Sequence, residues 1–560
     1  MRIPSKSKDS EIYRLFEVGG VVAFVLVVVL ILLFNPSTGG IVTDQAEPIV
    51  KIEAYASAMP NQGWAPMTVY FSAFGSESQA GHIVKYEWDL DANGLYDTDA
   101  TEKGGYVSYY YAKPGEYTIT LRVIDDQGNT ATDSVVINVR HPASSSVDYR
   151  TVFDDSEVRR VDISLTTADW QYMWTDPEAK IEVPADAIVF GERLDNIGFR
   201  MRGQWSLRGS GEKKPWKINT DAYIEGQEFH NLKQLVFVNS LEDPSLIQEK
   251  MAYDLMHFAG VPASHVCYVE IWIDFTDDDE PPIFLGVYTM IERVDNKFVA
   301  NRFGRDNKGG NLYKASLAQR GPMDLVYHGD RIEDYPTQGG LYNIGKANNE
   351  EEADYSDILN FIRVIDGVKY ETPEDFAQAL EQVFNVDGFL RYMAAAVTLS
   401  GWDIYPYAGN NYYLYNNPGT GKFEWIPWDL TWGGNPEQPL FGREGLGFLE
   451  RAPLYDRVFE VERYRVRYAA YLDLLNREWF TYENVSTRVE RFHEMIAPYV
   501  TQGTGDKMYF GDTAMYPIEA FNNTWKEFGN FARQRSNFVL TTLAQGQWRS
   551  SDFDHPSSDY

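Results

Sequence analysis

Hydrophobic and polar residues alternate with a period of two in several short stretches between residues 49 and 140, and turn residues separate those stretches. Side chains of a strand point alternately to its two faces, so this pattern predicts strands that bury one face only. Short strands at regular spacing are typical of a sandwich of two sheets. We therefore predict a β-sandwich over 49–140, followed by a polar linker over 141–153.

Beyond residue 153 the pattern shifts from strands to helices. Alternating or wholly apolar runs predict strands in the first half of 154–545, whereas apolar residues at helical spacing dominate the second half. A single predicted hairpin interrupts the helices: "NNYYLYNNPGTGKFEWIPWDLTWGG", Asn410 to Gly434, with aromatic strands on either side of a Pro-Gly turn. The pattern predicts an α+β domain over 154–545 and a disordered polar tail over 546–560.

The N-terminal residues suggest a membrane anchor. Residues 18–34 are apolar without interruption and follow a basic segment, 1–17. Such a run is long enough to cross a bilayer, and its basic flank should stay in the cytoplasm. We predict a transmembrane signal anchor over 18–34, a single-pass location in the cell membrane, and C-terminal domains outside the cell. A cleaved signal peptide is the alternative.

The net charge limits the possible binding partners, and the cysteine content limits the possible cross-links. The formal net charge of -32 argues against a nucleic-acid partner, because phosphate backbones require clustered positive charge. The single cysteine, Cys267, excludes an intramolecular disulfide, and its apolar surroundings predict a buried thiol on a strand.

An acidic stretch lies inside the predicted sandwich. "DLDANGLYDTD" places oxygen-bearing side chains around a glycine, namely Asp89, Asp91, Asn93 and Asp97. Ligands at every second position can wrap calcium, and a solvated turn is the open alternative. The stretches "YEWDLDANG" and "YYYAKPGEYTITLRVIDDQGNTATDSVVINV" resemble the polycystic-kidney-disease-type (PKD) domain. That resemblance implies a spacer or adhesive module of an exported protein.

A basic strand pair and a helix open the larger domain. "GFRMRGQWSLRGSGEKKPWKI" contains Arg200, Arg202, Lys214 and Lys217. Glycines beside cations suit phosphate binding, and a solvated basic hairpin is the alternative. The predicted helix from Asp243 to Gly260 carries Glu249, which can pair with a strand lysine or remain solvated.

Four polar residues further along the chain follow the order of a catalytic and metal-binding set. Asp403 comes just after a predicted helix, Asn410 and Asn411 follow, and Asp429 ends the hairpin. Acid, carboxamide and second acid, in that sequence, are the catalytic and metal-binding residues of protein kinases. Carboxylate and carboxamide oxygens are also the ligands that magnesium prefers.

Five motifs together resemble the CotH-like (spore coat protein H) atypical protein kinase family over about residues 195 to 435. They are "FRMRGQWS...KKPWKI", "LVFVNSLEDPSLIQEKMAYDLM", "FLGVYTMIERVDNKF", "GNLYKA" and "WDIYPYAGNNYYLYNNPGTGKFEWIPWDLTWGG". The resemblance implies a protein-kinase-like domain that binds ATP with Mg²⁺, or Mn²⁺ in its place. It also implies phosphorylation of Ser or Thr on surface or exported proteins.

The resemblance assigns roles by position. It makes Asp403 the catalytic acid, and Asn411, Asn410 and Asp429 the magnesium ligands. Lys217, in preference to Lys214, becomes the phosphate-binding lysine beside Arg202, and Glu249 becomes the helix residue that pairs with this lysine. Glu292 ends the strand that leads to the linker holding the adenine. The chain departs from the family at Gln248, where an Arg is usual, in the long loop from Asp403 to Asn411, and in lacking a Gly-x-Gly-x-x-Gly loop.

Two other functions remain open from the sequence. A non-catalytic surface protein could use the same fold for adhesion or envelope assembly. Abundant aromatic residues and surface acids also allow a glycan-active protein, although no residue marks a sugar site. The expected fold class is thus multidomain: an N-terminal transmembrane helix, an all-β PKD-type sandwich, and an α+β protein-kinase-like catalytic domain.

Overall fold

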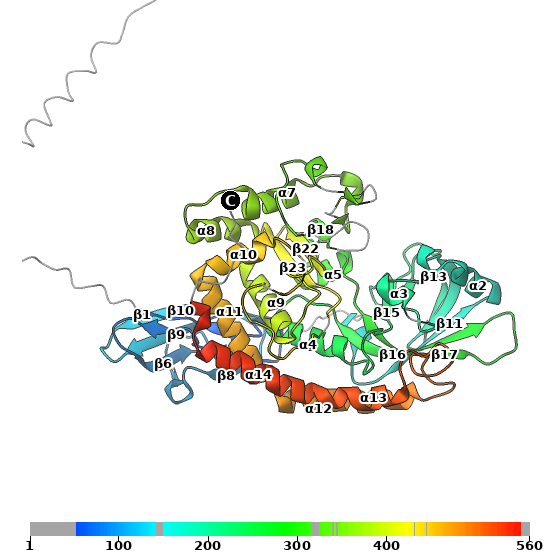
Figure 1. The fold of residues 1–560 in the computed structure, drawn as a ribbon, viewed down its shortest axis with the longest axis horizontal. Coiled ribbons are helices and arrows are strands. Elements are labelled where there is room, and N and C mark those ends of the chain that lie inside the picture. Colours follow the sequence, from blue (N-terminus) through cyan, green and yellow to red (C-terminus); the bar gives the residue numbers. More distant parts are fainter. Residues whose placement is uncertain are drawn as a thin grey trace, which may run out of the picture. The chain divides into compact units, whose positions relative to one another are not determined.

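The computed structural model describes residues 52–141, 149–209, 211–315, 324–335, 337–338, 341–342, 345–430, 432–443, 445–447 and 449–549. The chain divides into two units, Met1–Lys51 and Ile52–Tyr560. The described residues all belong to the second unit, in which Figure 1 colours the sandwich blue, the following strands cyan to green, and the C-terminal helices orange to red.

The first part of the second unit is a β-sandwich, as the alternating pattern predicts. One sheet has the strand order β3-β10-β9-β6-β7, the other β2-β4-β8, and β1 pairs with β5. Trp88 and Leu121 are wholly buried between the sheets. The strands are β1 (Ile52–Glu53), β2 (Ser57–Met59), β3 (Gln62–Trp64), β4 (Met67–Ser72), β5 (Glu77–Ser78), β6 (Ile83–Asp89), β7 (Thr98–Asp99), β8 (Val107–Tyr111), β9 (Gly115–Asp125) and β10 (Thr130–Arg140).

The acidic loop of the sandwich forms a turn closed by its own hydrogen bonds. The two carboxylate oxygens of Asp89 accept from the main-chain N–H groups of Asn93 (3.1 Å) and Gly94 (2.8 Å), and Asp91 accepts from the Asn93 side chain (3.1 Å). Asp97 accepts from the Thr98 hydroxyl at 3.3 Å. Within the described residues, no group of three or more His, Cys, Asp or Glu side chains could hold a metal ion.

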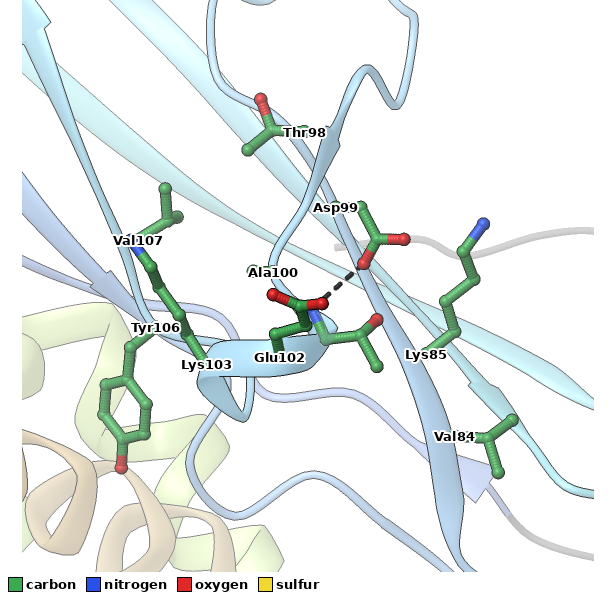
Figure 2. A pocket seen from close by; sticks show the side chains of 10 residues that line it. Val84, Lys85, Thr98, Asp99, Ala100, Glu102, Lys103, Tyr106 and Val107 are labelled. Carbon is green, nitrogen blue, oxygen red and sulfur yellow. Dashed lines mark hydrogen bonds between the residues drawn. The ribbon is translucent and has the colours of Figure 1, made fainter.

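A surface pocket lies beside this loop. Figure 2 shows it between β6, β7 and the short helix that follows β7, with the Asp99 carboxylate accepting from the main-chain N–H of Thr101 at 2.9 Å. Its lining contains none of the kinase-type residues that the sequence predicts. The pocket therefore belongs to the sandwich surface and does not bear on the larger domain.

The α+β part begins with a closed barrel of seven strands in the order β11-β12-β13-β14-β15-β17-β16. Strands β11 and β16 close it as a parallel pair, and the remaining pairs are antiparallel. Burial raises the pKa of the Cys267 thiol inside this barrel to about 12, which confirms the predicted buried thiol. The strands are β11 (Arg159–Leu165), β12 (Val183–Val189), β13 (Glu192–Met201), β14 (Trp216–Asn219), β15 (Gln234–Val238), β16 (Val266–Phe275) and β17 (Ile283–Ile291).

Helices and a four-stranded sheet follow the barrel. The sheet has the order β21-β18-β22-β23, from β18 (Leu312–Lys314), β21 (Gly345–Lys346), β22 (Tyr412–Asn417) and β23 (Lys422–Pro427), and β19 (Thr337–Gln338) pairs with β20 (Leu341–Tyr342). The helices are α2 (Thr167–Thr175), α3 (Trp205–Arg208), α4 (Gln248–Ala259), α5 (Asn296–Phe303), α7 (Ser356–Ile362), α8 (Pro373–Val383), α9 (Val386–Thr398), α10 (Pro453–Glu460), α11 (Glu462–Leu474), α12 (Tyr482–Val500), α13 (Ile518–Thr524) and α14 (Phe528–Ala544). A π-helical turn, η7 (Arg363–Gly367), continues α7.

The predicted aromatic hairpin is β22 with β23. Tyr412 and Trp425 face each other on neighbouring strands with ring centroids 4.1 Å apart, and Trp425 also contacts Phe389 and Tyr392 of α9. Both hairpin rings are almost completely buried. Because buried aromatic pairs contribute large apolar areas, α9 and the hairpin form one rigid packing unit.

The sandwich packs directly on the α+β part within the second unit. The guanidinium of Arg391, on α9, donates to the main-chain carbonyls of Ala58 in β2 (2.8 Å) and Ala259 in α4 (3.2 Å). The Gln62 side chain donates to the carbonyl of Gly260, the residue that ends α4 (2.7 Å). One arginine thus connects the sandwich to two helices of the larger domain.

The fold class needs one correction. Residues 18–34, predicted as a transmembrane helix, lie outside the described residues. Within the part of the chain that the structure describes, no helix has both the length and the apolar character needed to cross a bilayer. We therefore withdraw the transmembrane helix, the single-pass cell-membrane location and the membrane as a partner, and retain the β-sandwich followed by an α+β domain.

Candidate functional site

The two ends of the hairpin place Asn411 and Asp429 next to each other. The main-chain N–H of Trp428 donates to the carbonyl of Asn411 at 3.0 Å, which extends the ladder one step beyond β22 and β23. Asn411 (φ 61°) and Asp429 (φ 53°) both adopt the left-handed backbone region. Such conformations cost energy for residues other than glycine and often occur at functional sites.

Asp403 lies against the start of the same hairpin. The Asn411 amide donates to the Asp403 carboxylate and to the Asp403 carbonyl, both at 2.9 Å, and the Asn410 amide approaches the carboxylate at 3.3 and 3.4 Å. Burial raises the pKa of Asp403, and the negative charge of Asp429 adds to the shift. The structure therefore brings Asp403, Asn411 and Asp429 close together.

Arg202 and Glu249 bring the barrel and α4 to this site. Burial is the main cause that raises the pKa of Glu249 well above its usual value; Asp429 adds to it, and Arg202 opposes it. The charges of Asp429 and Glu249 likewise counter the burial that lowers the pKa of Arg202. The main-chain N–H of Asp429 donates to the Tyr253 hydroxyl at 3.3 Å, which joins the end of the hairpin to α4.

Lys217 lies in a group of cations on the outer face of the barrel. Lys217 on β14 lies opposite Arg200 on β13 in the antiparallel register, while its neighbours Trp216 and Ile218 point into the barrel core. Burial, followed by the charges of Arg293 and Arg200, lowers the pKa of Lys217 to about 7. A lysine that is desolvated beside other cations is poised to bind an anion, which would restore its charge.

Two predicted residues have other surroundings. The Lys214 ammonium is buried, donates to the carbonyl of Leu207 (2.8 Å) and lies over the Trp174 ring. Glu292 is buried in an ion pair with Arg302 (2.5 Å) and accepts from the main-chain N–H of His265. Lys214 is therefore tied to the main chain of Leu207, and Glu292 is held in a buried ion pair.

The structure adds three cations that the sequence reasoning did not assign, namely Lys180, Arg293 and Lys314. After burial, Arg293 and Arg200 lower the pKa of Lys217, whereas Arg200, Arg202 and Lys314 lower that of Lys180. Lys314 also lies over the rings of Tyr413 and Trp428, 5.4 Å from each centroid, and Trp428 immediately precedes Asp429 in the chain. Arg293 and Lys314 belong to the motifs "IERVD" and "GNLYKA", so the sequence carried a signal for both; nothing marked Lys180.

The donor set fits a magnesium ion shared with a nucleotide. Asn411 donates through its amide nitrogen, which leaves its carbonyl oxygen as the atom that a hard cation takes. Asp429 supplies an exposed carboxylate close by. Magnesium bound by only one or two protein oxygens completes its shell with phosphate oxygens and water. Such a site needs fewer than three acidic ligands from the protein.

Comparison with known proteins agrees with this geometry. The family model described as CotH kinase protein matches residues 199–539, more than half of the chain. The chain belongs to this family. A model of the PKD domain matches residues 46–139. Both resemblances drawn from the sequence motifs are thereby confirmed.

Two relatives align with much of this chain. Inner spore coat protein H of Bacillus subtilis is 25% identical over 367 residues, which cover 65% of this chain and 91% of that protein. Invasin CotH3 of Rhizopus delemar is 20% identical over 321 residues, 54% of this chain and 50% of the relative, so the chain spans about half of the invasin's length. Among solved structures, the PKD1 domain of the Vibrio cholerae metalloprotease PrtV has 27% identity over 16% of this chain and 95% of that domain, with a TM-score of 0.13.

Proposed function

We propose that this protein transfers the γ-phosphate of ATP, with Mg²⁺, to Ser or Thr side chains of surface or exported proteins. The convergence of Asp403, Asn411, Asp429, Glu249 and Arg202 carries the proposal. These residues come from the barrel, α4, the loop after α9 and the hairpin. Arg202 also acts on the pKa of Lys217 and of Lys180, so cations gather beside these residues in a chain of net charge -32 and concentrate positive potential where a triphosphate would bind.

Each group has a role that follows from its surroundings. Asp403, whose pKa is raised, would accept the proton of the acceptor hydroxyl. Asn411 and Asp429 would hold the metal ion, which neutralises phosphate charge when bound. Lys217 and Arg202 would bind phosphate oxygens. Glu249 would position Arg202, because Arg202, Asp429 and Asp243 are the charges that act on it. Arg202, rather than a lysine, is thus the cation that acts on this helix glutamate.

The acceptor is proposed to be a protein at a cell or spore surface. One relative is named as a spore coat protein and another as an invasin, and the PKD-type sandwich is a module common on exported proteins. These names suggest where the acceptor is found. Labelling experiments with candidate surface proteins would identify it.

Labelling with γ-phosphate tests the proposal. The full chain should transfer labelled phosphate to itself or to an acceptor in the presence of Mg²⁺ or Mn²⁺, and Asp429→Ala should lower the rate at least a thousandfold. Asp195→Ala, at an exposed position on β13, is the matched control and should retain the wild-type rate. Equal labelling by Asp429→Ala would refute the metal assignment.

Calorimetry separates the kinase from the alternative of a non-catalytic adhesion or assembly protein. Titration of the full chain with Mg-ATP should give a saturable heat, and Lys217→Met should weaken the affinity. No heat up to millimolar ATP would favour the non-catalytic function.

A further inference from the structure

The segment after Asp429, residues 430–452, connects the hairpin to α10. In ordinary protein kinases the corresponding segment is ordered when a phosphorylated residue within it pairs with arginine. Here residues 432–452 contain no Ser, Thr or Tyr, and Thr431 is the only hydroxyl-bearing residue between 430 and 452. The usual phosphate acceptor is therefore almost absent, which raises the question of what holds the segment.

A buried arginine connects this segment to the helix before Asp403. The Arg535 side chain of α14 is fully buried; it donates to the carbonyls of Pro436 (3.1 Å) and Gln438 (2.5 Å) and to that of Val397 in the last turn of α9 (2.7 Å). Burial lowers its pKa to about 10, so it keeps its charge at neutral pH. One guanidinium thus holds the segment after Asp429 against the helix that precedes Asp403.

Direct bonds join the same two regions. The Gln438 amide donates to the carbonyl of Gly401 (3.2 Å), and the Ser400 hydroxyl donates to that of Asn435 (2.7 Å). The N–H of Gly433 donates to the carbonyl of Leu399 at 3.0 Å, and a Cβ on Gly433 would lie only 1.8 Å from the Ser400 carbonyl oxygen. The backbone entering Asp403 and the backbone leaving Asp429 are therefore packed together without space between them.

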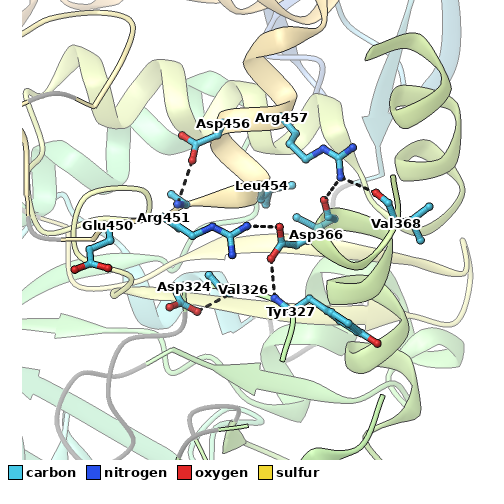
Figure 3. Close-up of polar contacts among 12 residues, drawn as sticks. Asp324, Val326, Tyr327, Asp366, Val368, Glu450, Arg451, Leu454, Asp456 and Arg457 are labelled. Atoms are coloured by element: carbon cyan, nitrogen blue, oxygen red, sulfur yellow. Dashed lines mark hydrogen bonds and ion pairs between the residues drawn. The ribbon is translucent and has the colours of Figure 1, made fainter. Parts of the chain in front are cut away.

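Two ion pairs hold the end of the segment. Arg443 makes two bonds to Asp456 of α10, at 2.7 and 3.0 Å, and both side chains are largely buried. Arg451 pairs with Asp366 of η7 at 2.5 Å, and the other Asp366 oxygen accepts from the Tyr327 main chain at 2.9 Å. Figure 3 shows Arg451 extending to Asp366, between Tyr327 and the α10 residues. Each pair joins an arginine of the segment to a carboxylate outside it. These carboxylates carry permanently the negative charge that a phosphate supplies in ordinary kinases.

We propose that these arginine contacts replace the activating phosphate of ordinary kinases, so that the site is assembled constitutively and needs no prior phosphorylation. This inference rests on the proposed function. Arg535, Arg443 and Arg451 are positioning residues: they fix the segment after Asp429, and through it the relative placement of Asp403 and Asp429. A built-in carboxylate cannot be removed by a phosphatase, so this ordering is not switchable.

Removal of phosphate is the first test. The full chain is treated with phosphatase, its phosphate-free state over 430–452 is checked by mass spectrometry, and the initial rate of γ-phosphate transfer is followed from the earliest times. We expect treated protein, untreated protein and Thr431→Ala to agree within twofold, without a lag. A tenfold loss after treatment that recovers on preincubation with ATP would overturn the inference.

Hydrogen exchange keeps the inference separate from the proposed function. If the wild-type chain transfers no phosphate at all, the proposed function fails, but amide exchange over 432–447 still reports whether the segment is ordered. Slow exchange in the phosphate-free chain supports arginine anchoring. Fast exchange there contradicts it, whatever the activity.

Variants at one ion pair test the positioning role. Arg451→Gln and Asp366→Asn should each lower kcat at least tenfold, change KM for ATP less than twofold, and speed exchange over 432–447. Arg451→Lys, which retains the charge, should recover at least half of kcat, and the double variant should lose no more than either single one. Wild-type kcat in both single variants, or additive losses in the double variant, would refute the role.

Arg463→Gln provides the matched control for these variants. Arg463 pairs with Glu374 and Glu381 of α8 rather than with any residue of the segment. Removing that ion pair should leave kcat and the exchange over 432–447 unchanged. A loss equal to that of Arg451→Gln would assign the effect to general destabilisation and overturn the positioning role.

Discussion

Lys217 is the residue whose ionisation the site alters most clearly. Its pKa of about 7 lies below the ordinary value because burial and neighbouring arginines disfavour the charged form. The unfolded chain therefore binds more protons at this position than the folded chain between pH 7 and about 10.5. By linkage, this group makes stability rise with pH across that window, and its cost is fully present below pH 7.

A pH-dependent affinity for nucleotide follows from this residue. An anion beside Lys217 favours the charged lysine, so binding should take up a proton near pH 7, and ATP affinity should fall about tenfold from pH 6.5 to 8.5. Calorimetry in buffers of different ionisation enthalpy measures that uptake. Lys217→Met should bind ATP more weakly and with a flatter pH profile, while Lys233→Met, a barrel lysine paired with Asp221, should behave like wild type. An unchanged profile in Lys217→Met would contradict the assignment.

At the scale of elements, the hairpin β22–β23 determines where the proposed metal ligands lie. Asn411 and Asp429 sit at its two ends in left-handed conformations, so their positions depend on the packing of the strands between them. The Tyr412 and Trp425 rings stack within the hairpin, and α9 covers them. The buried aromatic body lies between these two residues in the chain and fixes their relative position.

Substitution of the hairpin core should separate it from the turn. Trp425→Ala should lower the free energy of unfolding by about 3–5 kcal/mol, because it leaves a large cavity under α9, and should weaken Mg-ATP binding in the folded protein. Thr420→Ala, at the exposed turn, should change the free energy of unfolding by less than about 0.5 kcal/mol. Urea unfolding and calorimetry below the melting temperature measure both effects; similar losses from the two variants would contradict this division.

At the scale of the molecule, the sandwich is part of the larger core. Met59 of β2 belongs to the main hydrophobic cluster of the α+β part, and the Tyr106 hydroxyl donates to buried Asp473 of α11 at 2.7 Å. The sandwich also contacts α4, which carries Glu249, through Gln62 and Gly260. The PKD-type module therefore supports the helix that reaches the candidate site.

Loss of the arginine at this junction should affect both parts. Arg391→Met removes the ion pair with Asp387 and the bonds to Ala58 and Ala259, so we expect a loss of about 2–3 kcal/mol in the free energy of unfolding. Hydrogen exchange should increase both in β2 and at the end of α4. Arg193→Met, which removes exposed ion pairs with Asp186 of β12 and Asp195 of β13, is the control. An increase confined to the sandwich would show that the two parts are not coupled.

The sequence by itself determined the elements and the order of the site residues. Period-two alternation defined the sandwich, the turn at Pro418 defined the hairpin, and the order of Asp403, Asn411 and Asp429 indicated kinase-type chemistry. These features are local, because strand periodicity, turn chemistry and motif spacing depend on neighbouring residues. The sequence also predicted a transmembrane helix, which the described structure does not support.

Only the tertiary structure decided which side chains meet. It turned Lys214 toward Leu207, paired Glu292 with Arg302, made Arg202 rather than Lys217 the cation that acts on Glu249, and brought Arg293 near Lys217 and Lys314 near Lys180. The physical reason is that these contacts join residues far apart in the chain. Barrel closure and the packing of α4 and the hairpin fix them, and no local pattern encodes that packing.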